Sequence, residues 1–189
     1  MSKKTCPVWL GYVLLFPLRK LFQSPRRILS PYVREGMTVM DIGCAMGYFS
    51  LPLAEMVGPA GKVISVDLQK DMIVALEKRA DRAGLSERIE TRQCGHNTLG
   101  LDDLSEQVDF ALAFAVVHEV HDPERLFSEL CKALKPGARL LIAEPRFAVK
   151  ESELQASIAA AEKNGFASVG RPKIGQSRTI LLEKKQGVS

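Results

Sequence analysis

The sequence has few cysteines and no pair of them at the spacing of a metal or redox motif. The four cysteines among its 189 residues are scattered, and none belongs to a Cys-x-x-Cys pair. This scatter argues against a disulfide framework and against a zinc site. We therefore expect a protein of the reducing cytoplasm that holds no metal ion.

The sequence also lacks an apolar run near its beginning that is long enough to cross a membrane. The apolar stretch 8–16 is roughly half of the ~20 residues that a spanning helix needs. Pro17, Arg19 and Lys20 interrupt it, and no small-residue cleavage site of a signal peptide follows. Residues 1–35 are predicted to form a helical cap. Contact of 8–22 with a membrane surface is a less favoured alternative, and a pure packing role also stays open.

No region of the sequence concentrates charge of one sign. The net charge is +4, and basic residues are distributed from Arg19 to Lys185. This distribution is typical of solvated surface charge and argues against a nucleic-acid partner. A content of 46% apolar and 25% charged residues is ordinary for a globular protein, so we expect one compact domain, 36–189, after the cap.

From Met37 onward, segments typical of strands alternate with segments typical of helices. The predicted strands are 37–42, 62–67, 89–94, 108–114 and 140–144, and the predicted helices are 47–57, 70–83, 122–135 and 151–164. Two further strands, 166–169 and 179–182, are too close in sequence for a crossover helix and should pair antiparallel. The pattern predicts an α/β fold, a doubly wound and mostly parallel sheet.

The most informative segment is the glycine loop after the first predicted strand. Residues 39–47 read Val-Met-Asp-Ile-Gly-Cys-Ala-Met-Gly, and Asp67, at the end of the second strand, follows Gly47 by twenty positions. Glycine lets the backbone approach a ligand closely, and an acid at the next strand end can accept both hydroxyls of a ribose. This is the ground plan of an adenosine-binding βαβ unit.

The spacing of the glycines discriminates between adenosine ligands. A dinucleotide fingerprint would place glycines at 43, 45 and 48, but the chain has Ala45 and Tyr48 at the last two positions, and no Gly-Lys-Ser/Thr phosphate loop is present. An NAD-dependent oxidoreductase is therefore the less favoured alternative. The loop resembles instead the first motif of the class I S-adenosylmethionine (SAM)-dependent methyltransferases, acidic-x-Gly-x-Gly-x-Gly, with Ala45 in place of the middle glycine.

Three further segments carry the same resemblance. Residues 63–67 resemble the ribose-binding strand end of that family, and residues 108–118 and 134–142 resemble motifs of its ubiquinone- and menaquinone-biosynthesis members. The resemblance covers nearly the whole chain and implies a Rossmann-like seven-stranded sheet with an antiparallel C-terminal strand, S-adenosyl-L-methionine as cofactor, and methyl transfer as activity. A non-catalytic SAM-binding or scaffolding module is the alternative that Ala45 keeps open.

The resemblance also implies the residues that bind the cofactor. Asp67 is placed for the ribose hydroxyls, and Leu68 and Met72 are candidate adenine walls that could equally belong to the core. Asp41 is expected to anchor the loop or the methionine amino group. The other predicted cofactor-binding residues lie in the loop or after the third and fourth strands: Gly43, Cys44, Ala45, Gly47, Gly95, His96, Asn97, Ala113, Phe114 and His118.

The predicted chemistry is an in-line displacement that mainly requires donor and acceptor to be aligned. A general base helps only if the acceptor carries a proton to remove, and His118 and Glu119 are the catalytic candidates. His118 and His121 are three apart, not four as in a metalloprotease helix, so no metal is predicted. Glu144, Pro145 and Arg146 end the fifth strand and could also meet the substrate.

Sequence features after the fourth strand narrow the methyl acceptor. That region has neither the Asn/Asp-Pro-Pro-Tyr run of nucleic-acid amino methyltransferases nor a Pro-Cys nucleophile for cytosine chemistry. We expect a small-molecule acceptor. The apolar residues of 8–16, in the predicted cap, favour an apolar acceptor.

Overall fold

The structure is a computed structural model, which describes residues 24–187. The chain divides into two compact units, residues 1–93 and 94–189. Most of the predicted cap, residues 1–23, lies outside the described residues, so the cap stays a prediction. No helix within 24–187 has the length and apolarity to cross a membrane.

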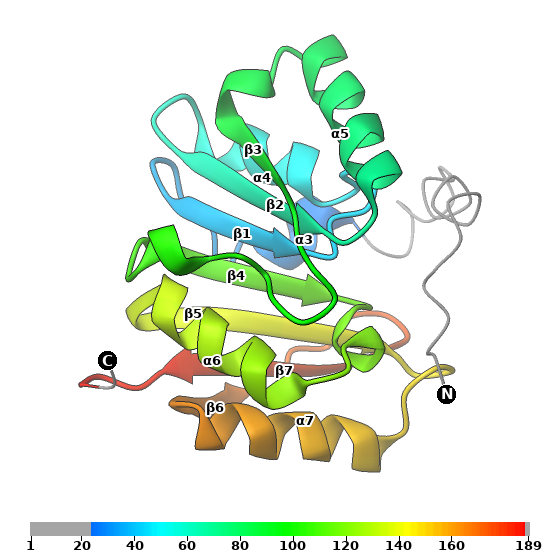
Figure 1. Ribbon diagram of the computed structural model, residues 1–189, viewed down its shortest axis with the longest axis vertical. Coiled ribbons are helices and arrows are strands. Elements are labelled where there is room, and N and C mark those ends of the chain that lie inside the picture. The colour runs from blue at the N-terminus through cyan, green and yellow to red at the C-terminus, as the bar shows by residue number, and fades with distance from the viewer. Residues whose placement is uncertain (1–23, 188–189) are drawn as a thin grey trace. The chain divides into compact units, whose positions relative to one another are not determined.

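The first unit contains a parallel three-stranded portion of sheet, in the order β3-β2-β1 (Figure 1). Its elements, in chain order, are α3 (Pro25–Leu29), β1 (Thr38–Ile42), α4 (Ser50–Val57), β2 (Lys62–Asp67), α5 (Lys70–Arg82), η1 (Ser86–Arg88) and β3 (Ile89–Gln93). The helix α4 packs against β1 and β2, and α5 packs against β2 and β3.

The interior strands of this unit read as apolar runs because both of their faces are covered. Val39, Met40, Val63 and Val66 have no exposed surface, as parallel strands between helical layers require. The register pairs Ile42 with Val66, so β1 and β2 end side by side. This pairing brings the glycine loop and Asp67 to the same edge of the sheet.

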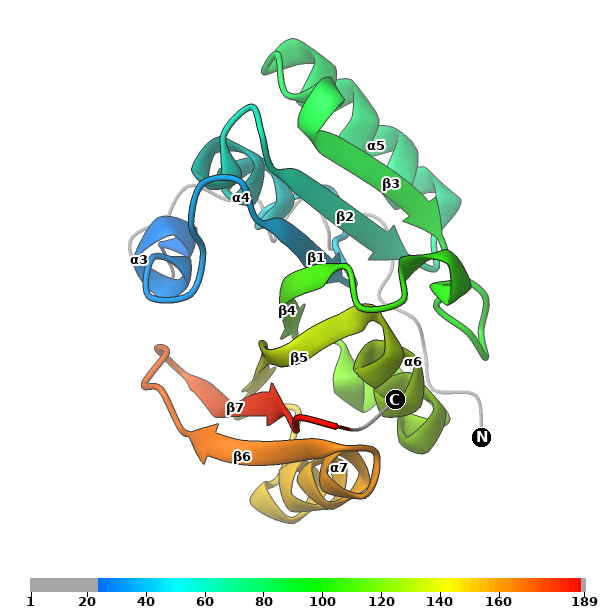
Figure 2. The same cartoon turned by 90° about the vertical axis from the view of Figure 1, so that its left-hand side faces the viewer.

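Within the described residues, the second unit contains four strands in the order β4-β5-β7-β6 (Figure 2). Its elements are η2 (Asp102–Leu104), β4 (Val108–Phe114), η3 (Val117–Glu119), α6 (Pro123–Ala133), β5 (Leu134–Pro145), α7 (Glu151–Lys163), β6 (Phe166–Gly170) and β7 (Ser177–Lys184). β4 and β5 are parallel, whereas β7 pairs antiparallel with both β5 and β6. The predicted antiparallel terminal pair is confirmed.

The described residues contain seven strands, three in the first unit and four in the second, and the predicted α/β fold class is confirmed. Two predicted element starts differ from the structure by three residues or more. The helix α4 starts at Ser50, not at 47, because Gly43, Ala45 and Gly47 all have positive φ angles, which an α-helix cannot contain. The second concerns the fifth strand.

The fifth strand begins at Leu134, inside the segment that was predicted to be the end of a helix. Leu134 is fully buried and pairs with Val108, but the next pair is Phe110 with Arg139. Residues 135–138 therefore bulge out of the strand around Gly137, which has a φ of 78°.

Candidate functional site

The glycine loop of the first unit is tied to the end of β2 by backbone hydrogen bonds. The N–H groups of Gly43 and Cys44 both donate to the carbonyl of Val66, at 2.8 and 3.1 Å. The φ angles are 68° at Gly43 and 80° at Gly47, in the left-handed region that glycine adopts without a Cβ penalty. The start of the loop is thus held against the end of β2 by two backbone hydrogen bonds.

Gly47 serves packing as well as conformation. A Cβ atom built on it would overlap the side chain of Leu76 from α5. Leu76 itself is fully buried. The last glycine of the motif therefore allows α5 to pack closely on the loop.

Ala45 has a left-handed backbone conformation, which favours glycine. Its φ is 46°, a region that costs an alanine roughly 1–2 kcal/mol. Its N–H donates to Oδ2 of Asp67 at 2.8 Å, and a hydrogen bond to a charged group contributes about 1.5–3 kcal/mol. The added methyl group is accommodated because this bond offsets the strain.

Asp67, the predicted ribose-binding residue, is 8% exposed and is oriented by backbone amides. Oδ1 accepts from the N–H of Gln69 at 2.9 Å, and Oδ2 accepts from that of Ala45. Burial raises the pKa of Asp67, and these backbone hydrogen bonds oppose the rise. Each carboxylate oxygen has a second lone pair, so the oriented carboxylate retains capacity for ribose hydroxyls.

Asp41 belongs to β1, just before the glycine loop, and is almost fully buried. Its Oδ2 accepts a 2.6 Å hydrogen bond from the hydroxyl of Ser50, the first residue of α4. Burial raises the pKa of Asp41 to about 7, and the charge of Asp67 adds to the rise. Of its two predicted roles, this contact supports the anchoring of the loop.

These residues fit SAM better than a phosphate-bearing ligand. The loop offers closely approaching backbone, and the neighbouring strand end offers an oriented carboxylate, as a ribose and a methionine moiety need. Two carboxylates, Asp41 and Asp67, lie near each other, which disfavours a phosphate there and favours a cationic group such as the methionine amine.

The two predicted adenine walls, Leu68 and Met72, differ in burial. Met72 is 2% exposed, which supports its alternative interpretation as a core residue. Leu68 is half-buried and directly follows Asp67, and its carbonyl accepts from the amide of Gln93 at 3.3 Å. Cys44 packs in an apolar cluster with Ile73 and Leu76. Leu68 remains the better candidate for a wall.

The sequence interpretation missed Arg79, on α5. Its guanidinium donates to the carbonyl of Met46 in the loop, 33 positions earlier, and partial burial lowers its pKa. Arg79 thus fastens α5 to the loop. No local pattern signals this contact, because it depends on how α5 packs.

In the second unit, His118 is paired with Glu144. His118 lies in η3, directly after β4, and Glu144 lies near the end of β5. Nδ1 of His118 is 2.5 Å from Oε2 of Glu144, while Oε1 accepts from the N–H groups of Val117 at 2.8 Å and His118 at 3.3 Å. Glu144 is buried, and the side chain of His118 is 29% exposed.

The parallel pairing of β4 with β5 explains this contact. Its register sets Phe114 opposite Ala143, so Glu144, the next residue of β5, lies beside the residues that follow β4. The sequence placed Glu144 at this edge but did not predict its bond to His118. Glu119, the other catalytic candidate, stays a prediction.

The remaining candidates of the second unit fall into two groups. Gly95, His96 and Asn97 are exposed in a bend that the Gly95 N–H closes by donating to the Thr98 carbonyl at 2.9 Å. This bond supports a turn-forming role. Ala113 and Phe114 are buried at the end of β4.

Within 24–187, no three His, Cys, Asp or Glu residues are grouped as a metal site would need.

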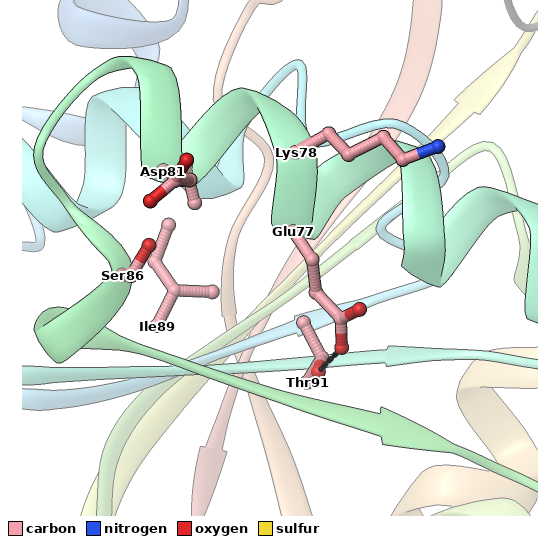
Figure 3. A pocket seen from close by; sticks show the side chains of 7 residues that line it. Glu77, Lys78, Asp81, Ser86, Ile89 and Thr91 are labelled. Atoms are coloured by element: carbon pink, nitrogen blue, oxygen red, sulfur yellow. Dashed lines mark hydrogen bonds between the residues drawn. The ribbon is translucent and has the colours of Figure 1, made fainter.

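A surface cavity of about 350 Å³ in the first unit contains none of the predicted residues (Figure 3). It lies between the second half of α5 and the first half of β3, and Glu77 and Thr91 within it hydrogen-bond to each other at 2.7 Å. The glycine loop and Asp67 lie instead at the carboxyl ends of β1 and β2. Because open α/β sheets bind ligands at those ends, we assign no ligand to this cavity.

Comparison with known proteins agrees with this geometry. The profile of the methyltransferase domain family matches residues 33–186. A ubiquinone/menaquinone biosynthesis C-methyltransferase from Francisella tularensis subsp. novicida is 30% identical over 132 residues, covering 70% of this chain and 52% of that protein. A ubiquinone biosynthesis O-methyltransferase from Azorhizobium caulinodans is 31% identical over 148 residues, covering 78% and 54%.

A solved structure shows the same fold. The crystal structure of a SAM-dependent methyltransferase from Aquifex aeolicus superposes with a TM-score of 0.83 at 24% identity, covering 95% of this chain and 98% of that one. The chain belongs to the methyltransferase domain family. The predicted family, enzyme class and cofactor, SAM, are confirmed at the level of this domain. The chain spans about half the length of the two quinone-biosynthesis relatives.

Proposed function

We propose that this chain transfers a methyl group from SAM to a small-molecule acceptor. The observation that carries the proposal is the bond between the Ala45 N–H and Asp67, which joins the glycine loop to the ribose-binding carboxylate. The cofactor supplies an electrophilic methyl group on a sulfonium, so no residue of the chain has to activate the donor. The chain's task is to hold and align the reactants.

Each group of first-unit residues has a distinct part in holding the cofactor. The backbone of 43–47 would contact the methionine moiety, and Asp67 would accept the ribose hydroxyls. Asp41 would keep the loop attached to α4 through Ser50. Leu68 would cover one face of the adenine.

The names of the relatives support a small and apolar acceptor. Two of them act in ubiquinone or menaquinone biosynthesis, and a geranyl diphosphate C-methyltransferase shares the fold with a TM-score of 0.68. In the second unit, Phe147 follows the end of β5 and is 91% exposed. An exposed aromatic side chain two residues after Pro145 offers an apolar surface near a strand end where ligands bind. We further propose that the protein works in the cytoplasm and that residues 1–35 cap the acceptor.

Ligand binding tests this proposal directly. S-adenosylhomocysteine, the demethylated product, should raise the melting temperature of the full chain, whereas NAD should not. In calorimetry, Asp67→Ala should weaken S-adenosylhomocysteine binding by about 10- to 100-fold, since hydrogen bonds to a charged group contribute about 1.5–3 kcal/mol.

The matched control is Asp71→Ala, which removes an exposed carboxylate four positions later and should bind as the native chain does. Stabilisation by NAD alone would contradict the proposal. An unchanged dissociation constant for Asp67→Ala would remove Asp67 from the cofactor site.

A further inference from the structure

The buried carboxylate of Glu144 has its two oxygens committed to different donors. Oε1 accepts from two backbone N–H groups, those of Val117 and His118. Oε2 faces Nδ1 of the His118 ring at 2.5 Å. If Glu144 only capped the backbone after β4, the contact of Oε1 would be enough, so the contact of Oε2 with the ring requires a separate explanation.

This arrangement determines which ring nitrogen of His118 carries the proton. A carboxylate accepts hydrogen bonds and donates none, so Nδ1 must be the donor. In the neutral ring, Nε2 is then the nitrogen that carries the lone pair. A buried acid that orients a histidine in this way gives the ring the tautomer that accepts a proton at Nε2.

We infer that Glu144 is a positioning residue that makes His118 a proton acceptor, and that the methyl acceptor is a compound with an acidic O–H, N–H or C–H group. This inference rests on the proposed function and specifies its substrate class. A base would serve no purpose for an acceptor that has no proton to lose, such as a thioether or a tertiary amine.

In the proposed step, proton transfer to His118 accompanies methyl transfer to the acceptor. The acceptor's X–H bond breaks and its proton passes to Nε2 of His118, while the electron pair on X forms the X–CH₃ bond. The bond between the methyl carbon and the sulfonium breaks, and its electron pair stays on sulfur as a neutral thioether. His118 is left as an imidazolium beside the Glu144 carboxylate, which stabilises the new charge.

The substitution Glu144→Gln tests the positioning role. The two backbone N–H groups still need an acceptor, so the glutamine oxygen must take the place of Oε1, and its NH₂ group must face the ring. Nδ1 then has to accept, which forces the proton of the neutral ring onto Nε2. We expect long-range ¹H–¹⁵N NMR to show His118 protonated at Nδ1 in the native chain and at Nε2 in Glu144→Gln.

The chain suits this measurement because it contains only three histidines. His118→Gln assigns the signal, and His96 and His121 are internal references. The matched control is Glu129→Gln, since Glu129 also accepts from a loop N–H, that of Leu99 at 2.7 Å, but its bonds go to residues other than histidine. This control should leave the His118 tautomer unchanged. An Nε2–H ring in the native chain, or an unchanged tautomer in Glu144→Gln, would overturn the inference.

A second measurement tests the substrate class. Labelled SAM is offered with phenols and hydroquinones, which have a proton to lose, and with dimethyl sulfide and trimethylamine, which have none. We expect methylation in the first group only, and a fall in kcat of about 10²- to 10⁴-fold in Glu144→Gln, with S-adenosylhomocysteine binding unchanged. Methylation of the second group alone, or of neither group, overturns the assignment of a protic acceptor. If the native chain did not bind S-adenosylhomocysteine, the proposed function would be contradicted instead. The His118 tautomer is measured separately and does not depend on that outcome.

Discussion

The two units of the chain each place an alanine in the same strained conformation shortly after a strand, but they use it differently. Ala45 follows β1 with a φ of 46°, and Ala115 follows β4 with a φ of 58°. The N–H of Ala45 donates to a side chain, the carboxylate of Asp67, whereas that of Ala115 donates to the backbone carbonyl of Ala143 at 2.8 Å. In the first unit the strained residue orients a functional group, and in the second it only closes the strand end.

The candidate site carboxylates of the two units, Asp67 and Glu144, also differ in their hydrogen-bond partners. Asp67 is held by backbone N–H groups on both oxygens, whereas Glu144 shares its second oxygen with the ring of His118. A backbone N–H group can only donate, but an imidazole nitrogen can donate or accept. The first unit therefore has a rigid binding group, and the second has a group whose proton arrangement can change.

The largest expected effect is on the pH dependence of the free energy of unfolding, and it concerns Asp41 of the first unit. The pKa of Asp41 rises from 3.8 to about 7 on folding because the group is buried. The folded chain therefore binds a proton more tightly than the unfolded chain, and this contribution to stability is lost as the pH rises from about 4 to about 7.

Asp41→Asn should flatten this part of the profile. Each unit of pKa shift corresponds to about 1.4 kcal/mol, so the free energy of unfolding of the native chain, relative to Asp41→Asn, should fall by a few kcal/mol across the window. Urea unfolding between pH 4 and 8 measures it. Parallel profiles for the two chains would show that Asp41 does not titrate in this range.

Gly47→Ala should show how far the first unit depends on close packing of the loop. The new methyl group would overlap Leu76 and would also sit at a positive φ. We expect a loss of about 2–4 kcal/mol, from overpacking of 1–3 kcal/mol plus about 1 kcal/mol of backbone strain. Gly84→Ala is the control, because Gly84 has a φ of 67° with open space around its Cα. Equal losses in urea unfolding would mean that Leu76 moves aside freely.

Matched amide substitutions should distinguish the two carboxylates. In Asp67→Asn the new NH₂ group must face either the Ala45 or the Gln69 N–H, so a donor meets a donor, with a loss of about 1–3 kcal/mol. In Glu144→Gln the histidine ring can accept instead, and the loss should stay below about 1 kcal/mol. Chemical unfolding of both variants at pH 7.5 measures the difference. A larger loss for Glu144→Gln would contradict the assignment of an adaptable partner.

The smallest expected effect is a gain in stability. Ala45→Gly and Ala115→Gly should each raise the free energy of unfolding by roughly 0.5–1 kcal/mol, because relief of left-handed strain exceeds the added flexibility of the unfolded chain. Thermal melts of the two variants measure the gain. We expect S-adenosylhomocysteine to bind Ala45→Gly at least as tightly as the native chain. Weaker binding would show that the alanine methyl group itself contacts the cofactor.

The local features of the first unit were the most predictable part of the molecule. Asp67, the glycine loop and the strands β1 and β2 could be predicted because a parallel βαβ unit follows from short-range periodicity and glycine positions. The start of α4 was wrong, since positive φ at Gly47 cannot be read from glycine content alone. The fifth strand was wrong at its start because burial of Leu134, a tertiary effect, decided it.

The glycine loop, the acidic strand end and the alternation of strands and helices were determined by the sequence alone, because each depends on residues within about one βαβ unit. Only the tertiary structure decided that Glu144 binds His118, 26 positions earlier, and that Arg79 holds Met46. Neither partner lies within reach along the chain. The register of β4 with β5 and the packing of α5 bring them together, and both arise from burial of apolar surface over the whole unit.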